Sequence, residues 1–166
     1  PSTGPSRGLS LVVLVVLGVV ACEARIDPAM VEAEVVAFGQ YTLGDGQPEL
    51  VTPGQSVPCR LGQVIGVEYR LSTRDGSTGP VPVELRWTHP KLDGEQGRPP
   101  RVETPIDQST PEIARGRSAV FGRALWSFEA PGDLVEGRYA FEIRTRDPDA
   151  LLLTRAFDVE GCPQGP

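Results

Sequence analysis

Few residues in this 166-residue sequence have side chains that can carry out chemistry. There are three cysteines, Cys22, Cys59 and Cys162, and a single histidine, His89. A lone histidine cannot build a His-rich metal site, and a catalytic triad needs a nucleophile held beside its histidine. Because Pro90 follows His89 and ends a strand pattern, we interpret His89 as a structural residue, with a catalytic or ligand role as the alternative.

Two acidic pairs have the i, i+2 spacing that calcium loops use: Asp147 with Asp149, and Asp93 with Glu95. Neither pair is followed by the distal glutamate of the twelve-residue calcium loop, so we interpret them as turn residues. The sequence also lacks a Gly-x-Ser-x-Gly elbow, a phosphate-binding glycine loop and a paired-cysteine metal motif. We therefore predict no catalytic residue, no cofactor and no metal.

Trp87 and Trp126 are the only two tryptophans. They would form a platform for carbohydrate if they were exposed. Because both lie in alternating strand patterns, we predict instead that they pack in the core.

The start of the chain has the pattern of a secretory signal peptide, which we assign to residues 1–21. Arg7 precedes a twelve-residue apolar run, LSLVVLVVLGVV, from Leu9 to Val20. As a helix this run would rise about 18 Å, which is short of the roughly 30 Å hydrocarbon core of a bilayer. A transmembrane anchor is therefore not expected.

The apolar run ends in Val19-Val20-Ala21-Cys22, which resembles the lipobox of bacterial lipoproteins. In such proteins the cysteine becomes lipidated, and two or three acyl chains are enough for stable membrane anchoring. The resemblance predicts lipidation at Cys22. The alternative is ordinary cleavage after Ala21 or Ala24, with Cys22 incidental.

Lipidation of Cys22 would leave Cys59 and Cys162 as an even pair. In an oxidising compartment such a pair is expected to form a disulfide. We predict a Cys59–Cys162 bridge, and the alternative is two unpaired cysteines at opposite ends of the domain.

The charge balance of the chain excludes one class of binding partner. The chain has 16 Lys+Arg against 22 Asp+Glu, a formal net charge of −6. A general nucleic-acid binder needs a basic footprint, so no nucleic-acid partner is expected. Glu23 is not the aspartate that retains many enterobacterial lipoproteins at the inner membrane. We expect an exported protein of the cell envelope, anchored in the outer membrane and facing the periplasm or the surface.

After Cys22 the chain divides into short alternating runs separated by glycine and proline, which is typical of strands. The predicted strands are residues 31–41, 64–71, 81–88, 119–128, 137–145 and 151–159. The last two are joined by a short turn around Pro148 and predict an antiparallel hairpin. The fold class predicted is all-β, an immunoglobulin-like antiparallel sandwich of about seven strands over residues 31–162. Residues 22–30 are expected to be a linker and residues 163–166 a tail.

Residues 91–118 interrupt this pattern with prolines, glycines and many charges. Loops of this length are functional or disordered, and we expect this one to be mostly disordered or loosely draped over the domain. Within it, Arg101–Thr104 is a candidate edge strand. Ser109-Thr110-Pro111-Glu112 has the form of a capping box and predicts one helical turn near 110–115.

Several segments resemble a bacterial family designated domain of unknown function 3859. They are Phe38-Gly39-Gln40-Tyr41, Tyr69-Arg70-Leu71, Trp87-Thr88-His89-Pro90, Trp126-Ser127-Phe128-Glu129, Tyr139-Ala140-Phe141-Glu142-Ile143 and Phe157-Asp158-Val159. The resemblance covers roughly residues 31–160. It implies an exported or surface-associated β-sandwich and carries no activity.

These observations favour a non-enzymatic envelope lipoprotein whose β-sandwich is a binding or structural module, with an unknown protein or glycan as its partner. The alternative is an envelope hydrolase or an enzyme-inhibitor accessory that uses His89 and the 91–118 loop.

Overall fold

The computed structural model describes residues 25–44, 46–92, 101–106 and 110–163. It contains eleven strands in this part of the chain: β1 (Val31–Thr42), β2 (Glu49–Pro53), β3 (Ser56–Pro58), β4 (Val64–Thr73), β5 (Gly79–Pro80), β6 (Val83–Leu92), β7 (Arg101–Pro105), β8 (Glu112–Ile113), β9 (Ala119–Ser127), β10 (Gly137–Thr145) and β11 (Leu151–Glu160). Two three-residue 3-10 helices, η1 (Pro28–Met30) and η2 (Pro131–Asp133), complete it. Neither of these helices is long or apolar enough to cross a membrane.

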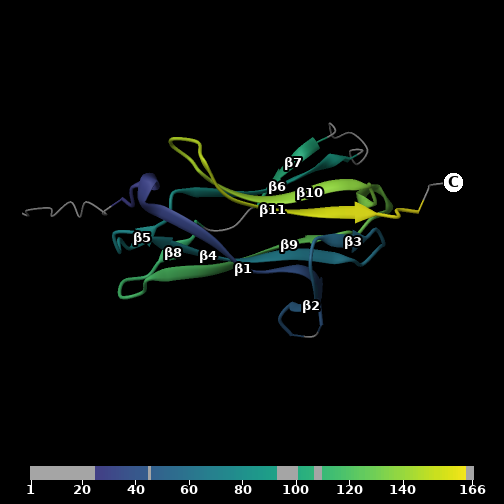
Figure 1. Ribbon diagram of the computed structural model, residues 1–166, viewed down its shortest axis with the longest axis horizontal. Helices are drawn as coiled ribbons and strands as arrows, with labels where there is room; N and C mark the ends of the chain where they lie inside the picture. The colour runs from purple at the N-terminus through teal and green to yellow at the C-terminus, as the bar shows by residue number, and fades with distance from the viewer. Residues whose placement is uncertain (1–24, 45, 93–100, 107–109, 164–166) are drawn as a thin grey trace, which may run out of the picture.

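Two sheets face each other as the layers of a sandwich (Figure 1). One has the strand order β2-β1-β4-β9 and the other β3-β11-β10-β6-β7. Strands β1, β4 and β9 thus correspond to A, B and E of an immunoglobulin fold, and β6, β10 and β11 to C, F and G. The predicted all-β, immunoglobulin-like sandwich is confirmed. One pairing departs from the antiparallel pattern, because β3 runs parallel to β11.

The alternating residues of the long strands form the core between the sheets. On β4 these are Ile65, Val67, Tyr69 and Leu71, and on β10 they are Tyr139, Phe141 and Ile143. All seven are at most 2% exposed, as a period of two residues requires when one face of a sheet is packed. Strand β1 keeps this pattern only with a bulge between Val35 and Ala37, which turns Phe38 toward the core and leaves Val36 exposed.

The centre of the core is a cluster of aromatic rings that connects the two sheets. Phe141 stacks on Tyr69 at 5.5 Å between ring centroids, and Trp87 lies 5.7 Å from Phe141. Gly122 leaves room for the Tyr69 ring, because a Cβ there would lie 2.3 Å from the tyrosine Cζ. Trp87, on the strand that corresponds to C, occupies the place of the core tryptophan of immunoglobulin domains.

A tyrosine corner closes the connection from β9 to β10. The Tyr139 hydroxyl donates to the carbonyl of Val135 at 3.0 Å and lies 3.3 Å from that of Asp133. In antibody domains the corner tyrosine stands two residues before the core cysteine. Here that position is Phe141, so the stack with Tyr69 lies where those domains have a disulfide.

One prediction for residues 91–118 is wrong and another is confirmed. The helical turn predicted near 110–115 is wrong: Glu112–Ile113 is strand β8, paired with β5. Ile113 is 1% exposed, so burial of this apolar side chain prevails over the local capping pattern. The edge strand predicted from Arg101 is confirmed as β7, and the described parts of this segment contain strand rather than only loop.

Candidate ligand-binding site

His89 lies at the end of the aromatic core and is 6% exposed. Its Nδ1 is 2.9 Å from the Pro90 carbonyl, which only accepts, so Nδ1 carries the proton. Its Nε2 lies 2.9 Å from the Thr104 hydroxyl, and its ring lies 4.9 Å from that of Trp126. Nε2 therefore joins β6 to β7, while Nδ1 contacts a carbonyl within β6 itself, and the arrangement supports the structural interpretation of His89.

The two tryptophans are core residues, as predicted. Trp87 is 2% and Trp126 8% exposed, and their rings are 6.1 Å apart. Neither is available as a platform for a sugar ring.

The predicted disulfide is present at the far end of the sandwich from η1. Cys59 and Cys162 are joined, with Cα atoms 4.6 Å apart. This distance lies within the range that disulfides require. Cys59 follows β3 and Cys162 follows β11, so the bridge continues the parallel pairing of these two strands. Cys22 lies outside the described residues.

The acidic pairs do not gather into a metal site. Asp149 forms a two-point ion pair with Arg144, at 2.7 and 3.1 Å, in the turn between β10 and β11. Asp93 and Glu95 lie outside the described residues. Over the ranges that the structure describes, no three potential ligands come together as a metal site.

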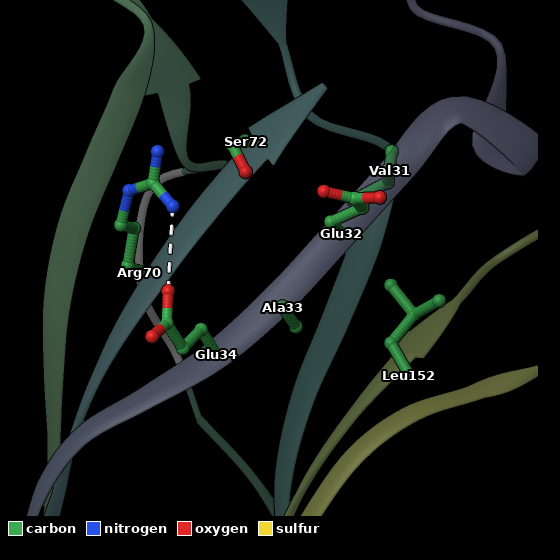
Figure 2. A pocket seen from close by; sticks show the side chains of 7 residues that line it. All are labelled: Val31, Glu32, Ala33, Glu34, Arg70, Ser72 and Leu152. Atoms are coloured by element: carbon green, nitrogen blue, oxygen red, sulfur yellow. Dashed lines mark hydrogen bonds and ion pairs between the residues drawn. The ribbon is translucent and has the colours of Figure 1, made fainter. Parts of the chain in front are cut away.

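Figure 2 shows a cavity of about 380 Å³ beside the first half of β1. Ala33 and Leu152 border it from the two sheets, and Glu34 and Arg70 lie on its outer side. Its charged groups are already paired: Arg70 lies 3.3 Å from Glu34, and Glu32 lies 3.6 Å from Arg74. A ligand charge would have to displace these partners.

In a second cavity, of about 410 Å³, the arginine side chains are not paired with acidic residues of the described ranges. It lies at the end of the sandwich that carries η1 and is lined by Arg25, Ile26, Pro28, Pro80, Val81, Pro82, Thr110, Arg146 and Asp147. A neighbouring cavity of about 360 Å³ shares Thr110 and Arg146 with it. Among the described residues, the side chains of Arg25 and Arg146 have no hydrogen bond or ion pair. We call this cavity the arginine pocket.

The arginine pocket has no signature in the sequence. Arg25 and Arg146 are more than a hundred residues apart, and no spacing rule connects them. The only local signals are the prolines on both sides of Val81 and the turn after β10. Folding of η1 against the β5–β6 connection brings them to one cavity.

Comparison with known proteins agrees with the fold and gives no family. No protein-family model matches the sequence, and no curated protein matches it. An immunoglobulin-like protein from Pseudomonas aeruginosa is similar in structure, with a TM-score of 0.58 and 19% identity over 82% of this chain and 99% of that chain. The alkylpurine DNA glycosylase AlkC from Pseudomonas fluorescens, bound to DNA containing an abasic site analog, has a TM-score of 0.46 at 10% identity, over 80% of this chain and 31% of that one.

The first likeness is too low in identity to show more than a shared fold, and the second supports no conclusion. Membership of the domain of unknown function 3859 family remains a prediction. What the comparison establishes is that the chain has an immunoglobulin-like fold.

Proposed function

We propose that this chain is an exported, lipid-anchored immunoglobulin-like module of the bacterial envelope that acts by binding a protein or glycan partner. The observation that carries the proposal is the Cys59–Cys162 disulfide. Disulfides persist in oxidising compartments, which supports export. The bridge also uses two of three cysteines and leaves Cys22, which directly follows the apolar run and the lipobox-like tetrapeptide.

A binding role also fits the site chemistry better than catalysis does. Both ring nitrogens of the only histidine contact a hydroxyl and a carbonyl within the fold. The hydrolase or inhibitor alternative relied on His89, and no arrangement of the described residues favours it. Glu23 after the proposed lipidation site supports an outer-membrane address.

The proposal is tested by replacing Cys22 with serine in the producing cell. The wild-type chain should incorporate a palmitate analogue and partition with membranes, whereas Cys22→Ser should lose the label and be released by washing. The double variant Cys59→Ser/Cys162→Ser is the control, because it removes two thiols and keeps Cys22, and it should still be labelled. An unlabelled wild-type chain, cleaved after Ala21 or Ala24 and found in the soluble fraction, would contradict the anchor.

A further inference from the structure

The two arginines of the arginine pocket project from backbone that the fold holds in place. Arg25 precedes Ile26, which is 2% exposed and belongs to the hydrophobic core. Arg146 follows the last residue of β10, and its N–H donates to the Pro82 carbonyl at 3.2 Å. Arg25 and Arg146 therefore line the same cavity from backbone positions that the packed fold holds, at the η1 end of the sandwich.

The chemistry of these groups selects an anion. A guanidinium carries five N–H donors in a planar fork that fits phosphate and carboxylate oxygens. The guanidinium groups of Arg25 and Arg146 form no hydrogen bond or ion pair with another residue in the described ranges, so their donors are available to a ligand. Pro28, Pro82 and the fully buried Val81 provide an apolar wall beside them. The pocket thus combines unpaired positive charge with an apolar surface.

Asp147 also lines the pocket and opposes an anion. The chain as a whole has a net charge of −6, so it has no general attraction to an anionic surface. Anion binding at this end would therefore depend on direct contact with Arg25 and Arg146, which makes it open to a test with single substitutions.

The distance along the chain between the arginine pocket and Cys22 indicates which anion lies near the pocket. Arg25 is three residues after Cys22, and three residues span about 10 Å at most. If Cys22 is lipidated, as proposed above, the pocket lies at the level of the phospholipid headgroups. We propose that the arginine pocket binds the phosphate of an anionic phospholipid and that this contact holds the η1 end of the sandwich against the membrane. This inference rests on the proposed anchor.

The test uses the chain beginning at residue 22 with Cys22 replaced by serine, which keeps every described residue and cannot be lipidated. Its binding to phosphatidylglycerol vesicles is measured by co-sedimentation at low salt, with phosphatidylcholine vesicles and inorganic phosphate as the other probes. An arginine near a membrane surface contributes about five-fold to binding. Arg25→Gln and Arg146→Gln should each weaken binding to phosphatidylglycerol about five-fold, the double variant about 25-fold, and Asp147→Asn should strengthen it.

Arg138→Gln is the matched control. Arg138 is exposed, lies at the opposite end of the sandwich and has no ion pair among the described residues, so its loss should leave binding unchanged. An equal loss in Arg138→Gln, or no preference for phosphatidylglycerol over phosphatidylcholine, overturns the proposal. Inorganic phosphate that binds without any vesicle binding overturns it in favour of a soluble ligand. Failure of the anchor itself is seen separately, as absence of the palmitate label on Cys22.

Discussion

Two tyrosines, Tyr139 and Tyr41, pack against opposite faces of the β2-β1-β4-β9 sheet and stabilise different parts of the fold. Tyr139 reaches across to this sheet from the inside and is fully buried, and its hydroxyl fixes the η2 corner. Tyr41 is on the outer face, where its ring covers Gly66 and lies 5.7 Å below the guanidinium of Arg123. Burial raises the pKa of both tyrosines to about 12, with the charges of Asp133 and Glu68 adding to the effect at Tyr139 and Tyr41 respectively. Both hydroxyls therefore remain protonated donors over the range in which the protein is handled.

These two tyrosines make a matched pair for substitution. Tyr139→Phe keeps the ring and removes the donor to Val135, so a buried carbonyl loses its partner, and we expect a loss of about 1–2 kcal/mol in the free energy of unfolding. The Tyr41 hydroxyl is buried and has no hydrogen bond of good geometry among the described residues, although the Glu68 carboxylate lies near enough to raise its pKa, so Tyr41→Phe should cost clearly less than Tyr139→Phe. Urea denaturation at neutral pH measures both. Equal losses in the two variants would show that the corner hydrogen bond is not what stabilises the β9–β10 connection.

At the scale of elements, the sequence predicted the six long strands because each is a run of at least eight residues and most of the runs alternate, although residues 119–128 are apolar on both faces near Trp126. Strand β10 matches its predicted range, and the inward parity on β4, β6 and β10 is confirmed. The short strands β2, β3, β5 and β8 were not predicted, since two to five residues are too few to show a period, and three of the four strands also contain proline. Their positions depend on partners distant in sequence, as when Val57 pairs with Val159.

The candidate site was less accessible to sequence reasoning than the strands were. The two tryptophans were correctly predicted to pack in the core, because their neighbours in sequence define strands. The structural role of His89 stays a prediction, and its stated reason was wrong: Pro90 does not end the strand, because β6 continues to Leu92. The arginine pocket depends on loops that meet only after the sheets have packed. Contacts between loops that are distant in the chain leave no pattern in the sequence of either loop.

The hairpin of β10 and β11 offers a pH-dependent test at this scale. The hydrogen bonds from Arg144 hold the pKa of Asp149 below its ordinary value of 3.8. A lowered folded-state pKa gives stability that is present above the unfolded value and is lost as pH falls through the folded value. We therefore expect wild-type and Asp149→Asn chains to differ in free energy of unfolding near pH 6 and to converge as the pH falls through the lowered pKa of Asp149. Asp147→Asn is the control, because Asp147 lies in the same turn and has no ion pair among the described residues. The difference in free energy of unfolding between this variant and the wild-type chain should not shrink with falling pH in the way expected for Asp149→Asn.

At the scale of the whole molecule, the disulfide lies outside the position that it has in antibody domains. There a single disulfide in the core links the two sheets, whereas here an aromatic stack links them and the covalent bond lies elsewhere. The core contact between the strands equivalent to B and F is the Tyr69–Phe141 stack. The covalent bond is moved to the end of the sandwich, where Cys59 and Cys162 close a separation of 103 residues. The bridge also lies beside the hydrogen bond from the Cys59 N–H to the Glu160 carbonyl, at 2.9 Å. It therefore secures the end of β11 to β3, the shortest strand of its sheet.

This arrangement predicts how the protein responds to loss of the bridge. In the chain-entropy account, closing a loop of about 100 residues stabilises a protein by about 4.7 kcal/mol, and native disulfides contribute about 2–5 kcal/mol in practice. We expect Cys59→Ala/Cys162→Ala to lose about 2–4 kcal/mol by urea denaturation and to remain folded, because Cys59 lies at one end of the core cluster and the stacked aromatic rings at its centre do not contact the bridge through any ring contact. Hydrogen exchange should quicken in β3 and the last residues of β11 while β4 and β10 keep their protection. The wild-type chain treated with reductant is the control and should reproduce both effects. Uniform loss of protection across β4 and β10 would mean that the bridge supports the whole sandwich rather than one end of it.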